Sequence, residues 1–186
     1  PRRRARPLAA ALLLAAAPLA AQQPPHQPSA SDARAAAGPF DGPSPWPAIR
    51  RERIARLLPD AMREAGVDAW VVMLRENAND PLALHVGGEN AGAPSAVLVF
   101  REAGATGDDR VRTVMLAGFG EAIALRELAL HDSVVVYDGG TAGLERAIAE
   151  RLLAADPARI AVNSGGSGMA DGLSWTQRTG LERALG

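Results

Sequence analysis

Five short runs rich in apolar residues constrain the fold of this chain more than any other feature of its sequence. The runs are rich in β-branched and aromatic residues, which is typical of strands, and they lie at 68–74, 96–100, 111–117, 133–137 and 159–162. A strand without alternating polar residues needs cover on both faces. Because stretches of helical period separate several of these runs, the sequence predicts an α/β domain with a mixed β-sheet flanked by helices.

Helical periodicity marks two segments between and before these strands. Apolar residues recur at helical spacing over 49–65, where Gly66 supplies a stop. Pro59 is expected to kink or restart this first helix, since its ring removes a backbone donor. A second helix is expected over 141–155.

Turn and capping residues fix the connections. Gly104 and the run 107–109, which contains Asp108 and Asp109, predict a tight turn that makes the second and third strands an antiparallel hairpin. Both aspartates are expected to be solvated, and the glycines at 118 and 120 are expected to form an ordinary turn. A last helix is expected to begin at Ser174, which can form a capping box with Gln177.

Composition excludes several kinds of chemistry. All 20 basic residues among the 186 are arginine and there is no cysteine, so a Walker A lysine, a pyridoxal Schiff base, a thiolate nucleophile and a disulfide are all excluded. The formal net charge of -1 argues against a nucleic-acid-binding surface. The isolated histidines His85 and His131 have no second ligand at metal-binding spacing and are interpreted as surface or core residues.

The N-terminus has the layout of a secretory signal peptide. Four arginines precede an apolar stretch over 8–21 that ends in small residues, and we assign 1–21 to the signal. At 14 residues the stretch is too short for a lasting membrane anchor, and a secreted or periplasmic location follows. The Pro- and Ala-rich segment 22–47 is predicted to be a disordered linker, and 48–186 the folded domain.

Two polar segments are candidates for a functional site. The first, 75–81, follows a predicted strand, at the position where α/β sheets bind ligands, and its cleft candidates are Arg75, Asn79 and Asp80. A helix cap or interface loop is the alternative, since Asp80 and the following proline can start a helix. The second segment, 161–174, combines a strand end, a Gly-rich loop and a capped helix, and its simplest interpretation is structural.

Taken together, these segments resemble the N-terminal domain of the pita-bread metallopeptidase superfamily, which includes Xaa-Pro aminopeptidases, prolidases and creatinase. The resemblance covers 50–186. It rests on Leu-Leu-Pro-Asp-Ala-Met at 57–62, Ala-Gly-Val-Asp-Ala-Trp at 65–70, Arg-Glu-Asn-Ala-Asn-Asp-Pro at 75–81, Ile-Ala-Val-Asn at 160–163 and Ala-Asp-Gly-Leu-Ser at 170–174.

The resemblance implies a ribonuclease-H-like mixed-sheet domain that precedes a catalytic domain holding two divalent metals (Mn, Zn or Co). The family's ligands, two Asp, a His and two Glu, lie in that C-terminal domain and have no counterpart here, so no cofactor, metal ligand or catalytic residue is assigned to this chain. The implied partners are its own C-terminal catalytic domain, a peptide substrate and further copies of the chain. The family's N-terminal domain forms a wall of the substrate cleft, which would place Arg75, Asn79 and Asp80 beside that cleft.

Three hypotheses follow for function. The first is the exported, non-catalytic N-terminal portion of an Xaa-Pro aminopeptidase-like metallopeptidase acting on peptides with proline at the second position. The second is a free-standing exported α/β module that binds a ligand or partner without catalysis. The third keeps the fold and replaces peptidase chemistry with creatinase-like cleavage of a non-peptide C–N bond.

Overall fold

The computed structural model describes residues 42–75, 80–88, 94–105, 107–168 and 170–186. Ser44–Gly186 form one compact unit. The expected signal peptide and most of the expected linker lie outside the described residues and stay predictions. None of the described helices combines the length and apolar character that crossing a membrane requires.

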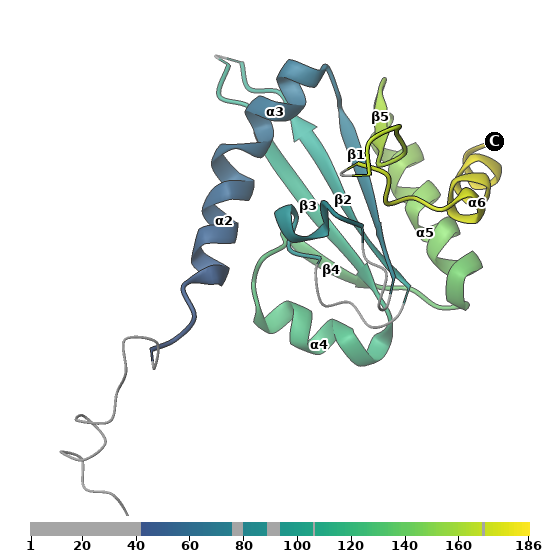
Figure 1. The fold of residues 1–186 in the computed structure, drawn as a ribbon, viewed down its shortest axis with the longest axis horizontal. Helices are drawn as coiled ribbons and strands as arrows, with labels where there is room; N and C mark the ends of the chain where they lie inside the picture. The colour runs from purple at the N-terminus through teal and green to yellow at the C-terminus, as the bar shows by residue number, and fades with distance from the viewer. Residues whose placement is uncertain (1–41, 76–79, 89–93, 106, 169) are drawn as a thin grey trace, which may run out of the picture. The chain divides into compact units, whose positions relative to one another are not determined.

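Five strands form one mixed sheet, which confirms the predicted fold class (Figure 1). Their order across the sheet is β4-β3-β2-β1-β5. The central strand β2 is antiparallel to both of its neighbours, β1 and β3, whereas β5 runs parallel to β1 and β4 runs parallel to β3. The strands are β1 (Ala69–Leu74), β2 (Ser95–Glu102), β3 (Arg110–Ala117), β4 (Ser133–Val136) and β5 (Ile160–Val162).

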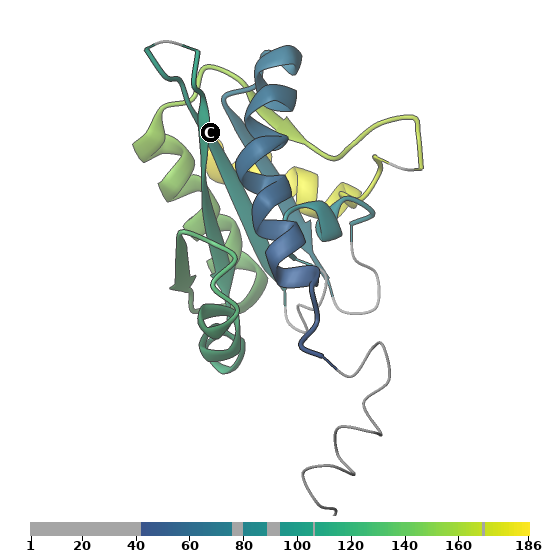
Figure 2. The same cartoon turned by 90° about the vertical axis from the view of Figure 1, so that its left-hand side faces the viewer.

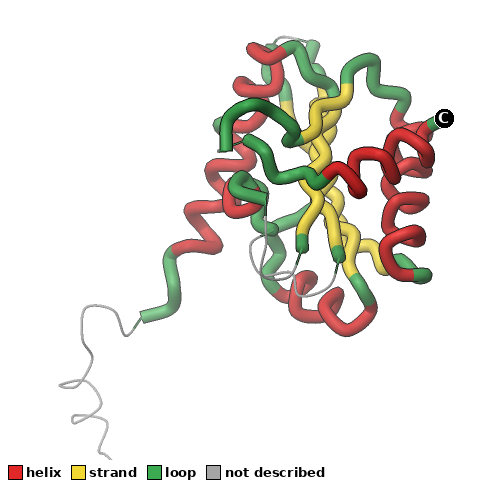
Figure 3. Tube along the Cα trace, turned by 45° about the vertical axis from the view of Figure 1, so that its right-hand side comes forward, coloured by secondary structure: helices red, strands yellow, loops and turns green. Residues whose placement is uncertain are grey.

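Helices cover both faces of this sheet (Figure 3). Both faces need this cover because alternate side chains of β1 are apolar. Val71 and Met73 pack into the core beneath α5 and α6, while Val72 and Leu74 pack into the core on the opposite face. That opposite face is covered by α2, which crosses the sheet in Figure 2, and by α3, α4 and a short 3-10 helix η1. The helices are α2 (Trp46–Arg56), α3 (Leu58–Ala65), η1 (Ala83–His85), α4 (Phe119–Glu127), α5 (Gly140–Ala155) and α6 (Trp175–Leu185).

The first predicted helix is divided as Pro59 required. Leu57 separates α2 from α3, and Pro59 occupies the first turn of α3, where its missing N–H costs no helical hydrogen bond. Gly66 ends α3 in the left-handed conformation, with φ at 63°. The capping box at Ser174 is also confirmed: Gln177 N donates to Ser174 Oγ at 3.2 Å, and Ser174 N donates to Gln177 Oε1 at 3.0 Å.

Helix α4 was not expected from the sequence. The glycines at 118 and 120, interpreted as an ordinary turn, instead begin this helix, with Gly118 as an N-cap that offers no side-chain hydrogen bond. The absence of a capping side chain and the glycine in the first turn removed the usual start signal. Exposed Phe119 and Ile123, at 77% and 58%, also disguised the helical period of apolar residues.

An ion-pair cluster joins the start of β1 to the β2–β3 hairpin. Arg101 Nη2 lies 2.8 Å from Asp68 Oδ1, and Arg101 Nη1 lies 3.2 Å from Asp109 Oδ2. The amide of Gly104 donates to Asp109 Oδ1 at 3.1 Å, so the expectation that Asp109 is a solvated turn residue is wrong: its side chain is 5% exposed. The Arg101 guanidinium lowers the pKa of Asp68, and the Gly104 amide, with Arg101, lowers the pKa of Asp109.

We expect this cluster to make the fold acid-sensitive. Carboxyl groups whose pKa is lowered by folding stabilise the native state above their unfolded pKa of about 4, and this stabilisation is lost as the pH falls through the lower native value. Arg101→Gln should therefore lower the melting temperature at pH 7 and flatten its decline below pH 4. The exposed pair of Arg56 and Glu52 offers the control, since Arg56→Gln should change neither quantity. If the melting temperatures of the wild type and Arg101→Gln fall in parallel between pH 7 and pH 2, the cluster is not the source of the acid sensitivity.

Candidate functional site

The two polar segments selected from the sequence meet where the parallel strands β1 and β5 end. Arg75 follows the last residue of β1, and Asn163 follows the last residue of β5. Because β5 pairs in parallel with β1, the residues that follow the two strands lie at the same end of the sheet. The loop that contains Gly172 returns to this end before α6 begins.

Asn163 is the centre of a buried hydrogen-bond network. Its Oδ1 accepts from Trp70 Nε1 at 2.7 Å, and its Nδ2 donates to Asp80 Oδ2 at 2.8 Å. Its backbone oxygen accepts from the amides of Gly172 and Leu173, at 3.1 and 2.8 Å. The side-chain amide and the backbone carbonyl of Asn163 therefore hold together β1, the loop after β1 and the loop before α6.

Asp80 is enclosed by this network. The residue is 3% exposed, and its Oδ1 accepts from the amide of Leu82 at 2.8 Å while Oδ2 accepts from Asn163. The backbone oxygen of Asp80 also accepts from the amide of Ala83, the first residue of η1. Asp80 thus forms the turn that precedes η1, and its hydrogen-bonded contacts are internal.

Arg75 reaches across to the second segment. Its Nη2 donates to the carbonyl oxygen of Gly172 at 3.1 Å. Gly172 itself packs against Asp80 so closely that a Cβ at this position would overlap the Asp80 carboxyl group. Asn79, the third predicted residue, lies outside the described residues. A role for Arg75, Asn79 and Asp80 in lining a substrate cleft stays a prediction.

A pocket of about 380 Å³ opens beside Arg75. Polar and charged groups predominate in its lining, which comes from the residue after β1, the loop after β5 and the first turn of α6. Trp175, at the start of α6, is 79% exposed. The lining consists of Arg75, Ser164, Asp171, Gly172, Leu173, Ser174, Trp175 and Arg178.

The sequence did not reveal how Asn163 connects these parts. Asn163 and Asp80 lie 83 residues apart, and Asn163 and Trp70 lie 93 residues apart, so no local spacing links them. The available signal was a polar residue directly after an apolar strand, which predicts a loop but not its partner.

The described part of the chain does not fit a metal centre. No group of three or more His, Asp or Glu side chains in it could hold a metal ion. The divalent metals that the family resemblance implies therefore have no ligands among these residues, and no chemical step through a metal is assigned to this chain.

Comparison with known proteins gives a structural likeness. No family model matches the chain, and no curated protein matches it in sequence. An Xaa-Pro dipeptidase from Bacillus anthracis is similar over 75% of this chain and 31% of that chain, with a TM-score of 0.50 and 15% identity. The N-terminal domain of an Xaa-Pro dipeptidase from Lactobacillus brevis matches 77% of this chain and 89% of that one, with a TM-score of 0.45 and 13% identity.

At these identities the likeness shows the fold. This chain spans 31% of the length of the Bacillus anthracis dipeptidase structure that it matches. The fold implied by the sequence resemblance, a mixed-sheet α/β domain of the creatinase and prolidase N-terminal type, is confirmed.

Proposed function

Because the chain has the fold of the N-terminal domain of an Xaa-Pro dipeptidase, we propose that it is the non-catalytic N-terminal portion of an exported, Xaa-Pro aminopeptidase-like metallopeptidase. The proposed enzyme is secreted or periplasmic and cleaves peptides that carry proline at the second position. Its two divalent metals are held by a C-terminal catalytic domain, and the present domain forms part of the substrate cleft and of a contact between copies of the chain.

The observation that carries the proposal is the fold of Ser44–Gly186. Its five-stranded sheet with helices on both faces is similar to the dipeptidase structure over three quarters of this chain. The signal-like arginines and apolar stretch at the N-terminus support export. The polar residues Arg75 and Arg178, which open to a pocket at one end of the sheet, are suited to contact a peptide or a neighbouring domain.

Reading the coding DNA beyond the codon for Gly186, and then assaying both products, tests the proposal. We expect a second domain with two Asp, a His and two Glu in that order. The longer product should release the N-terminal residue from an Xaa-Pro peptide when Mn²⁺ is added, because the metals would supply a Lewis acid and a nucleophilic water. The 186-residue chain should show no hydrolysis under the same conditions.

Two results would overturn this function. One is a stop codon directly after Gly186. The other is metal-dependent hydrolysis by the purified 186-residue chain, because its described residues contain no metal-ligand group. Hydrolysis of a non-peptide C–N bond by the longer product, with no action on Xaa-Pro peptides, would instead favour creatinase-like chemistry.

The polar pocket also favours a second candidate function. An exported α/β module that binds a ligand without catalysis needs only a preformed hollow with charged groups, and the pocket at Arg75 and Arg178 has both. A stop codon after Gly186 would make this the leading function.

A further inference from the structure

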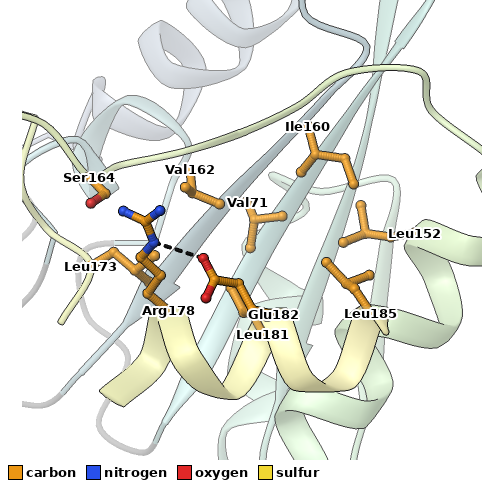
Figure 4. Close-up of a pocket in the computed structure, with 10 residues that line it drawn as sticks. All are labelled: Val71, Leu152, Ile160, Val162, Ser164, Leu173, Arg178, Leu181, Glu182 and Leu185. Atoms are coloured by element: carbon orange, nitrogen blue, oxygen red, sulfur yellow. Dashed lines mark hydrogen bonds and ion pairs between the residues drawn. The ribbon is translucent and has the colours of Figure 1, made fainter. Parts of the chain in front are cut away.

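The polar pocket beside Arg75 continues into an apolar one. A second hollow of about 320 Å³ lies between β5, α5 and α6, and the two hollows share Ser164, Leu173 and Arg178 in their linings. Figure 4 shows the guanidinium of Arg178 and the hydroxyl of Ser164 at one end of the apolar hollow. Ile160, Leu152 and Leu185 lie at the other end.

Two guanidinium groups line the polar hollow. Arg75 and Arg178 lie there with one carboxylate, Asp171, and a second carboxylate, Glu182, lines the adjoining hollow. Arg75 is held in place by its hydrogen bond to the Gly172 carbonyl. The first turn of α6, which starts at Trp175, adds the partial positive charge of a helix N-terminus to these two full charges.

Arg178 can exchange its present ion-pair partner, Glu182, for a ligand carboxylate. Its Nε pairs with Glu182 Oε1 at 2.9 Å, but both side chains are largely exposed, at 49% and 63%. A solvent-exposed i,i+4 pair contributes little free energy. An incoming carboxylate can therefore compete with Glu182 for the guanidinium, a group that often binds carboxylates through two hydrogen bonds.

The apolar hollow is partly open to solvent. Ile160 and Val162 of the edge strand β5 are 39% and 37% exposed, and both line this hollow. Covering such side chains with an apolar group is favourable because it removes apolar surface from water. The two adjoining hollows thus offer two guanidinium groups at one end and apolar side chains at the other within one site.

We propose that this composite site binds a carboxylate joined to an apolar group. The carboxylate lies between Arg75 and Arg178, and the apolar group enters the hollow formed by Ile160, Val162 and Leu185. The free C-terminus of a peptide ending in an apolar residue and a fatty acid share this chemistry. The site is formed by this chain alone and does not depend on the proposed peptidase function.

A pair of matched ligands tests the charge requirement. N-acetyl-leucine carries a carboxylate, whereas N-acetyl-leucinamide has nearly the same shape without the charge. Titration of the full chain with each, followed by the indole N–H resonance of Trp175 assigned through Trp175→Phe, should show at least tenfold tighter binding of the acid, the effect of about one charge-assisted hydrogen bond. Octanoate distinguishes a fatty acid from a peptide C-terminus as the natural ligand. If octanoate binds more tightly than N-acetyl-leucine, the ligand is a fatty acid, and if it binds more weakly, the ligand is a peptide C-terminus.

Two variants test the two ends of the site separately. Arg178→Gln should weaken binding of the acid about tenfold and leave binding of the amide unchanged. Arg183→Gln, on the same helix but outside both linings, is its matched control. Ile160→Asn should weaken acid and amide alike, and Leu153→Asn, at an exposed site outside the hollow, should weaken neither.

Three results would overturn the proposal. They are equal binding of acid and amide, no binding of N-acetyl-leucine or octanoate up to about 10 mM, and acid binding that Arg178→Gln leaves unchanged. None of these results bears on whether a longer product of the gene is a peptidase, so failure of this site and failure of the proposed function are distinguishable.

Discussion

Gly172→Ala is expected to destabilise the protein by about 2–3 kcal/mol, the effect of forcing an extra group into a packed site. The new Cβ would overlap the carboxyl group of Asp80 and approach its Cα to 2.8 Å. Asp80 cannot move aside without breaking its hydrogen bonds to Asn163 and Leu82. Urea unfolding followed by tryptophan fluorescence measures the change.

The same loop provides the control for this substitution. Gly166 has no atom within 4 Å of the position that a Cβ would occupy, and neither glycine has a left-handed φ. Gly166→Ala should therefore stay within about 0.5 kcal/mol of the wild type. Equal stability of the two variants would contradict the close packing of Gly172 against Asp80.

Asn163→Asp is expected to cost about 3–4 kcal/mol at pH 7, the range for leaving a buried charge without its partner. The change replaces the Nδ2 donor, 2.8 Å from Asp80 Oδ2, with a second carboxylate oxygen. Two carboxylates this close share a proton, so one of them has a raised pKa in the folded variant. A raised carboxyl pKa destabilises the native state above the unfolded value of about 4, and this loss is relieved as the pH falls towards that value.

The measurement is the difference in unfolding free energy between variant and wild type at pH 7 and at pH 4.5, which should be smaller at pH 4.5. Gln177→Glu makes the same amide-to-acid change at the third residue of α6, where a helix N-terminus and a capping box accept a glutamate. It should leave stability nearly unchanged at pH 7. An Asn163→Asp penalty that is the same at both pH values would contradict the contact with Asp80.

Local sequence signals predicted most elements of the fold. Pro59 and Gly66 marked the break and the end of the first helical segment, and the apolar runs located all five strands. The glycines and aspartates of 104–109 placed the β2–β3 hairpin, and Ser174 with Gln177 placed the start of α6. Each of these signals acts within a few residues, which is why it can be read without the structure.

Tertiary contacts account for what the sequence did not reveal. Helix α4 begins at a glycine without a capping side chain, and its Phe119 and Ile123 face outwards, so packing of Ala122 and Leu125 rather than a periodic pattern defines its buried side. Asp109 looked like a turn residue because its partner Arg101 comes from the neighbouring strand. Arg75 was placed correctly at the end of a strand, but its contact with Gly172 joins residues 97 positions apart.

The position of β5 in the sheet has a consequence for the order of folding. The β1–β2–β3 meander closes loops of about 30 residues or fewer, whereas the contact of Trp70 with Asn163 closes a loop of 93. Longer loops cost more chain entropy to close, and distant pairings slow folding. We therefore expect the three antiparallel strands to assemble first and β5 to dock onto them late. Arg75 gains its contact with Gly172, and Asp80 its contact with Asn163, at that final step, so we expect this end of the sheet to be the last to form and the first to open.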